Sequence, residues 1–148
     1  MTTKQRLLQI CNEHVDKRIN DYKEEINLIK ESIASNDKGN SEDDDSGNGK
    51  LLNDLEKNMG YLADANKTKD YLKLIKTNVE PVDVVLGSIV KTNEMNFYIA
   101  TSIGKIDLDS DVYFAISLNT PIGQLLKNKK VNDSFEFNQK KYVIQEII

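Results

Sequence analysis

The chain has 148 residues, which is about the length of one domain or of two small ones. It carries 20 basic and 24 acidic residues, for a net charge of −4, and only 39% of its residues are apolar. No apolar run approaches the roughly 18–20 residues of a membrane helix, and the N-terminus lacks an apolar signal segment. A single cysteine, Cys11, fits a reducing cytosol, so we expect a cytoplasmic protein. Because its basic residues are scattered and almost all lysines, sequence-specific DNA binding is not expected.

The N-terminal region is predicted to form a long helix. Residues 4–34 contain no Pro or Gly, and their apolar side chains recur at steps of three or four. This stripe consists of Leu8, Cys11, Val15, Ile19, Tyr22, Ile26, Ile29 and Ile33. A stripe this narrow is typical of a coiled coil.

A polar stretch follows at residues 35–50, where no side chain is apolar. It holds five acids and two lysines, so most of the chain's net negative charge is concentrated there. Gly, Asn and Asp favour turns over helix, and we therefore expect a loop.

Helical patterning resumes over residues 50–77, with Asn66 and Lys69 interrupting the stripe. The predicted apolar positions are Leu52, Leu55, Met59, Leu62, Leu72 and Ile75. Two helices of similar length joined by a polar loop form an antiparallel hairpin, which buries both stripes. The sequence therefore predicts a coiled-coil hairpin over residues 1–78 with its acidic loop at the tip.

Residues 79–148 change to a strand-like pattern and are predicted to form a small α+β domain. A polar loop is expected at 104–111, and a short helix at 122–127 begins after Thr120 with Pro121 in its first turn. The predicted strands cover 82–90, 97–103, 112–117, 131–137 and 141–148, with turns at 93–96 and 138–140.

The reactive side chains do not form a catalytic constellation. His14 lies in the first helix and is interpreted as a surface residue, while Cys11 lies on the apolar stripe and is expected to pack as a small apolar side chain. No glycine-rich phosphate loop is present. We therefore expect no catalytic residue and no cofactor site of the chain's own.

The acids of the polar stretch are the remaining candidates for chemistry: Asp37, Glu42, Asp43, Asp44 and Asp45. They are either a solvated loop or, from Glu42 to Asp45, ligands for a hard cation such as Mg²⁺, which prefers oxygen. An EF-hand fails, because counting from Asp44 places Leu55 where a bidentate Glu is needed. Since few side chains on a free tip would hold a metal weakly, we expect the tip to complete a metal site on a partner.

The sequence resembles the bacterial transcript-cleavage factors of the GreA/GreB family. The C-terminal likeness rests on four stretches, Gly87–Val90, Phe97–Ser102, Ile116–Leu126 and Lys129–Phe135, and on the closing run Tyr142–Ile147. With the hairpin, the resemblance covers nearly the whole chain. It implies an antiparallel coiled coil followed by an FKBP-like domain.

The resemblance also implies a function. The C-terminal domain would dock on bacterial RNA polymerase at the rim of the secondary channel, with Thr120 and Pro121 as candidate partner-binding residues. The coiled coil would carry the tip acids to the catalytic Mg²⁺, where they help the polymerase cut the 3′ end of backtracked RNA. The chain would then be a monomeric, non-enzymatic factor that shares Mg²⁺ with its partner.

The sequence departs from the family pattern at the turn and at the tip. Thr120-Pro121 stands where Ser-Pro is usual. The family tip has an Asp followed three places later by a Glu, but three places after Asp37 is Asn40; the pair Glu42 and Asp45 has similar spacing. The tip is also denser in acid than cleavage requires, which resembles the inhibitory Gre homologues.

Four functions stay open at this stage. The first is a Gre-like factor that stimulates RNA cleavage, and the second is a Gre-like polymerase inhibitor that uses the same channel. A coiled-coil adaptor without metal chemistry is the third. A peptidyl-prolyl isomerase, suggested only by the FKBP-like fold, is the fourth, and no aromatic-lined pocket is evident for it.

Overall fold

The computed structural model describes residues 1–38 and 45–148, and the side chains of residues 1–36 and 48–148. These residues form two compact units. The sheet unit comprises Met1–Asn12 and Tyr71–Ile148, and the hairpin unit comprises Glu13–Asp70. Among the described residues, no helix is apolar over a length that would cross a membrane. The predicted domain boundary after residue 78 stays a prediction.

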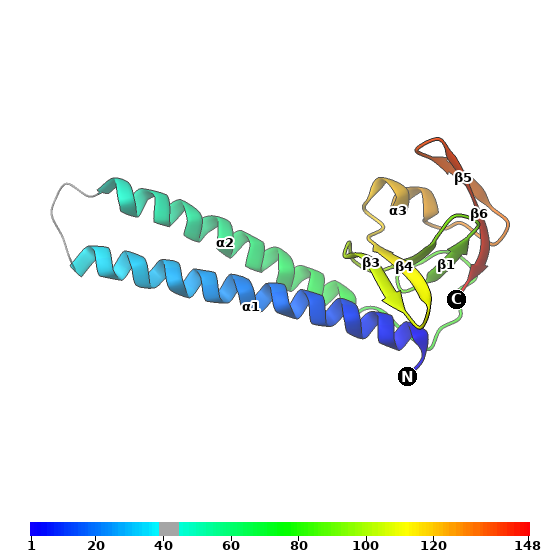
Figure 1. Ribbon diagram of the computed structural model, residues 1–148, viewed down its shortest axis with the longest axis horizontal. Coiled ribbons are helices and arrows are strands. Elements are labelled where there is room, and N and C mark those ends of the chain that lie inside the picture. Colours follow the sequence, from blue (N-terminus) through cyan, green and yellow to red (C-terminus); the bar gives the residue numbers. More distant parts are fainter. Residues whose placement is uncertain (39–44) are drawn as a thin grey trace. The chain divides into compact units, whose positions relative to one another are not determined.

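The hairpin unit is built from the long helices α1 (Thr3–Lys38) and α2 (Asp45–Leu72), as predicted (Figure 1). Contacts between them run in opposite order along the two helices, so the pair is antiparallel. Near one end, the Lys69 ammonium lies 2.8 Å from an Asp16 carboxylate oxygen. Further along, the rings of Tyr22 and Tyr61 have their centroids 5.6 Å apart.

The stripe predicted on α1 is confirmed from Cys11 to Ile29, where Val15, Ile19 and Ile26 are also buried. Its predicted start at Leu8 is wrong, because Leu8 is only half-buried and the neighbouring Leu7 is fully buried. On α2 the predicted stripe is wrong at two positions. Leu52 and Met59 are 51% and 52% exposed. The side of α2 that is at least half-buried instead follows a heptad of Leu51, Asn58, Ala65 and Leu72, with Leu55, Leu62 and Lys69 between them.

The helices also extend beyond their predicted ends. Residues 35–38 are helical, and α2 begins at Asp45 and not at residue 50. Because a helix propagates more easily than it nucleates, it continues past the last apolar contact into polar sequence. At its other end α2 stops at Leu72, five residues before the predicted end.

The sheet unit holds six strands in the order β3-β4-β2-β1-β6-β5, one more than the largest number predicted. The strands are β1 (Ile89–Thr92), β2 (Asn96–Ile99), β3 (Gly104–Leu108), β4 (Asp111–Ile116), β5 (Ser134–Phe137) and β6 (Lys140–Ile147). All neighbours pair antiparallel except β2 and β4, which are parallel. Helix α3 (Pro121–Leu126) lies between β4 and β5 in the chain.

Three predictions for the sheet unit differ from the structure. The expected strand at 82–90 is irregular until Ile89, because Gly87 takes a φ of +91°. Before it, the Val84 N–H donates to the Lys129 carbonyl and the Val84 carbonyl accepts from the Asn128 N–H, without a continuous ladder. The expected loop at 104–111 contains β3, in which Ile106 and Leu108 are buried while Lys105 and Asp107 are exposed. The strand expected at 97–103 ends at Ile99.

The β3–β4 and β5–β6 hairpins share one kind of turn. Asp109-Ser110 and Asn138-Gln139 are two-residue loops in which every φ is positive, as in a type I′ turn. The predicted turn at 138–140 is therefore confirmed, one residue shorter than expected.

Alternating side chains give the sheet two buried faces. Phe97 and Ile99 belong to a core with Leu126 of α3 and Ile144 of β6. The side chain of Tyr98, between them on β2, points to the opposite face, where it lies close to Cys11 of α1. The sheet is thereby covered on one face by α3 and on the other by the first turns of α1.

Candidate functional site

The predicted tip acids fall at the hairpin end, which we define as residues 33–38 of α1 and 45–51 of α2. Asp37 lies in the last turn of α1, and Asp45 is the first residue of α2. Glu42, Asp43 and Asp44 lie outside the described residues, as do the side chains of Asp37 and Asp45. The prediction that these acids hold a cation therefore stays a prediction.

The two helices stay paired up to the hairpin end. The side-chain amide of Asn36 donates a hydrogen bond to the side-chain oxygen of Asn48, with 3.2 Å between nitrogen and oxygen. Ile33, one turn before Asn36, is half-buried. Six residues, 39–44, lie between the end of α1 and the start of α2 in the sequence and outside the described residues.

Elsewhere on the described part of the chain, His, Cys, Asp and Glu side chains do not gather in groups of three that suit a metal. Cys11 is fully buried, and burial raises the pKa of its thiol to about 12. The prediction that Cys11 packs as a core residue is confirmed. His14 is half-buried and not a surface residue as predicted; burial, then Arg18 and Lys17, lower its pKa.

Thr120 and Pro121, the candidate partner-binding residues, begin α3. The Thr120 hydroxyl donates to the Ser117 carbonyl at 2.7 Å and accepts from the Gly123 N–H at 3.1 Å, so it caps the helix. Pro121 occupies the first helical position, as predicted, and is exposed. The Thr120 hydroxyl is therefore engaged within the fold, and Pro121 is the residue of the pair available to a partner.

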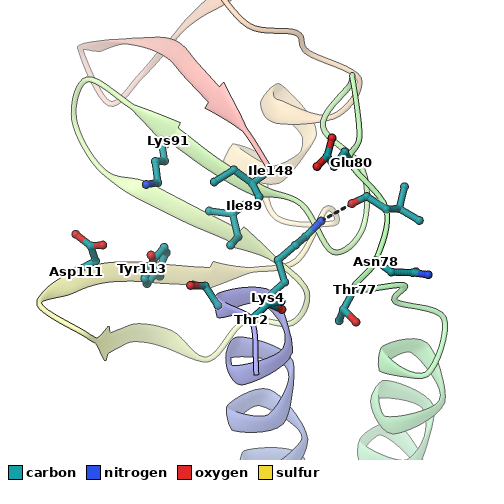
Figure 2. Close-up of a pocket in the computed structure, with 12 residues that line it drawn as sticks. Thr2, Lys4, Thr77, Asn78, Glu80, Ile89, Lys91, Asp111, Tyr113 and Ile148 are labelled. Atoms are coloured by element: carbon teal, nitrogen blue, oxygen red, sulfur yellow. Dashed lines mark hydrogen bonds between the residues drawn. The ribbon is translucent and has the colours of Figure 1, made fainter.

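Sequence reasoning missed one feature of the sheet unit, a cavity of about 460 Å³ beside the first turn of α1 (Figure 2). Lys4 lies along it and is only 6% exposed. Lys4 stands one turn before buried Leu7 and two turns before buried Cys11, so it lies on the buried side of α1. This helical spacing could have predicted the burial of Lys4 from the sequence.

No family model and no curated protein matches the sequence. Among solved structures, the chain is similar to the crystal structure of GreA factor homolog 1 (Gfh1) of Thermus thermophilus, with 18% identity and a TM-score of 0.35, over 98% of this chain and 94% of that one. It is also similar to Gfh1 of Thermus aquaticus, with 18% identity and a TM-score of 0.34, over 91% and 92% of the two chains. These similarities run over 91% or more of this chain and of each Gfh1 chain.

Proposed function

We propose that this protein is a Gre-like transcription elongation factor. It binds bacterial RNA polymerase at the secondary channel and stimulates the polymerase's own cleavage of backtracked RNA. The observation that carries the proposal is the antiparallel pairing of α1 and α2 right up to a six-residue connection that is rich in acid.

The hairpin suits this task because it is a narrow carrier. The 28 residues of α2 correspond to about 42 Å of helix. Two paired helices present little width along that length, and the short acidic segment joins them at one end of the pair. Such a carrier suits an active site that lies at the end of a channel.

The chemistry belongs to the polymerase. Carboxylates from Glu42 to Asp45 help to hold a second Mg²⁺ beside the resident one, and Asp37 is a further tip acid that acts in the polymerase site. Two metal ions stabilise the attacking and leaving oxygens of phosphodiester cleavage. The factor itself is not an enzyme, acts as a monomer in the cytoplasm, and contacts the RNA 3′ end only indirectly. Its FKBP-like domain docks outside the channel, with Pro121 of α3 at the contact.

A transcript-cleavage assay on stalled, backtracked bacterial elongation complexes in Mg²⁺ tests the proposal. The tip variant replaces Glu42 by Gln and Asp43, Asp44 and Asp45 by Asn. We expect shortened 3′ products with the unmodified protein and a loss of roughly tenfold or more in rate with the variant, as for loss of metal-site groups. Asp37→Asn, made separately, shows whether the acid on α1 contributes.

A matched control removes four charges from the body of the same hairpin. Glu24, Glu25, Glu31 and Glu56 are all exposed, and their replacement by Gln changes the net charge equally. This control is expected to keep full cleavage activity. Equal loss in both variants would show that only overall charge matters, and no cleavage with the unmodified protein would contradict the proposal.

The second candidate is a Gre-like inhibitor, which the four consecutive acids at 42–45 favour. In that case the unmodified protein slows elongation without producing cleaved RNA, and the tip variant relieves the inhibition. If the protein neither stimulates cleavage, nor inhibits elongation, nor binds polymerase, the remaining candidate is a coiled-coil adaptor.

A further inference from the structure

The cavity beside α1 lies wholly within the sheet unit. Its walls are the start of α1, the chain between α2 and β1, and strands β1 and β4 (Figure 2). A volume of about 460 Å³ falls within the range of sites for small molecules.

The most informative lining residue is Lys4. Its ammonium donates one hydrogen bond, to the Val79 carbonyl oxygen at 2.9 Å, and it has no ion pair with any described residue. An ammonium has three N–H donors, so two are left for other acceptors. Burial lowers the pKa of Lys4, and the charge of Glu80 partly opposes that shift. An almost buried lysine without a carboxylate partner favours an anion that enters from outside.

The first turn of α1 adds donors to the same cavity. Thr2 caps the helix: its hydroxyl accepts from the Gln5 N–H at 3.2 Å, and the Gln5 side chain accepts from the Thr2 N–H at 2.8 Å. The N–H groups of Thr3 and Lys4 stand in the first turn, where no helical carbonyl precedes them. The helix dipole reinforces the preference for negative charge at this point.

The opposite wall combines charge with apolar surface. Lys91 of β1 lines the cavity and, among the described residues, forms no ion pair. Ile89 and the buried Tyr113 supply apolar surface beside it. Thr77 and Asn78, on the chain after α2, add a hydroxyl and an amide.

Two acids also line the cavity, and both oppose the binding of an anion less than their charge suggests. Glu80 and Asp111 are exposed, so water and salt screen their charge, whereas Lys4 is desolvated. Burial and then the charge of Asp111 raise the pKa of the neighbouring Tyr113 hydroxyl, so that hydroxyl stays neutral beside the carboxylate.

We propose that this cavity binds a small organic anion, a phosphate ester or a carboxylate with an apolar body, whose charged group is held by Lys4, while Lys91 adds positive charge on the opposite wall. The apolar body lies against Ile89 and Tyr113. This site is separate from the tip acids and does not depend on the proposed action on polymerase.

Three probes of similar size separate charge from shape: phenyl phosphate, benzoate and neutral benzyl alcohol. Binding to the full-length ¹⁵N-labelled protein is followed by amide NMR shifts. We expect at least one anion to give saturable shifts centred on Thr3, Lys4 and Asn78, and benzyl alcohol to give none. Phenyl phosphate alone would identify the ligand as a phosphate ester, benzoate alone as a carboxylate, and both would mean that either group fits.

Two variants test the residues. Lys4→Met and Lys91→Met are each expected to weaken binding about tenfold, as for loss of a hydrogen bond to a charged group. Lys91→Met leaves the Lys4–Val79 hydrogen bond intact and so separates recognition from any loosening of the wall. Lys105→Met, on β3 away from the cavity lining, is the control and should bind normally.

Three results would overturn the proposal. They are no saturable shift with either anion, equal binding of benzyl alcohol, and unchanged affinity in both the Lys4 and Lys91 variants. Absence of transcript cleavage with the unmodified protein would contradict the proposed function but leave this result unaffected, so the two proposals fail independently.

Discussion

The sheet unit and the hairpin unit bury their apolar side chains in different ways. In the sheet unit, Phe97, Ile99, Leu126 and Ile144 are at most 1% exposed and are enclosed by strands and a helix. In the hairpin unit the buried residues form one seam between two helices, and water borders that seam on both sides. Substitutions that add volume are therefore expected to destabilise the sheet unit strongly. In the hairpin unit, such substitutions should be tolerated everywhere except along the seam.

The largest expected difference comes from adding one methyl group to a glycine in each unit. A Cβ at Gly123 would stand 2.1 Å from the Ser117 carbonyl oxygen, which the fold cannot relieve without breaking the Thr120 cap. We expect Gly123→Ala to lower the free energy of unfolding by about 3 kcal/mol.

The hairpin control is Gly60→Ala, where nothing lies within 4 Å of the added carbon. Alanine is the better helix former, so this change should raise the free energy of unfolding by roughly 0.5–1 kcal/mol. Urea unfolding followed by circular dichroism measures both. Equal effects of the two changes would contradict the contrast between the units.

A smaller effect locates the seam of α2. Asn58 is half-buried on the seam, and its side-chain nitrogen donates to the Asp54 carbonyl of its own helix at 2.8 Å. We expect Asn58→Leu to stabilise the hairpin by about 1 kcal/mol through apolar burial, and Met59→Gln to change little. Thermal unfolding of the two variants checks this, and a marked loss with Met59→Gln would place the seam at Leu52 and Met59 instead.

The smallest effect concerns a buried hydroxyl of the sheet unit. The Tyr98 hydroxyl has no hydrogen-bond partner among the described residues, and burial raises its pKa. Removing an unsatisfied group loses no hydrogen bond, so Tyr98→Phe should change the free energy of unfolding by less than about 0.5 kcal/mol. Urea unfolding measures this change, and a loss of more than about 1 kcal/mol would show that the Tyr98 hydroxyl makes a hydrogen bond after all.

The two helices also show why one seam could be predicted and the other only in part. On α1 the seam positions Val15, Ile19, Ile26 and Ile29 are apolar, so the spacing alone identifies them. On α2 the seam includes Asn58, Ala65 and Lys69, while exposed Leu52 and Met59 dilute the pattern. Lys69 is accommodated by Asp16, a pairing across the two helices that the pattern within α2 does not contain.

In the sheet unit, features set by neighbouring residues could be predicted from the sequence, whereas pairing between distant residues could not. Pro121 after a capping Thr120 predicts the start of α3 from neighbouring residues alone. The irregular stretch before Ile89 depends on bonds from Val84 to residues more than 40 positions away, which a local apolar run does not reveal. The cavity at Lys4 likewise joins residues from both ends of the chain.

The proposed function requires the hairpin end to reach the polymerase active site. A photo-crosslinking amino acid at exposed Asn36, beside the acidic connection, tests it directly, with exposed Glu136 on β5 as the control position. In complexes with bacterial RNA polymerase, we predict crosslinks from position 36 to the polymerase segment that carries the catalytic Mg²⁺, and none to that segment from position 136. Crosslinks to the active site from position 136 alone would contradict the proposed function. So would the absence of such crosslinks from position 36 in a complex that still forms.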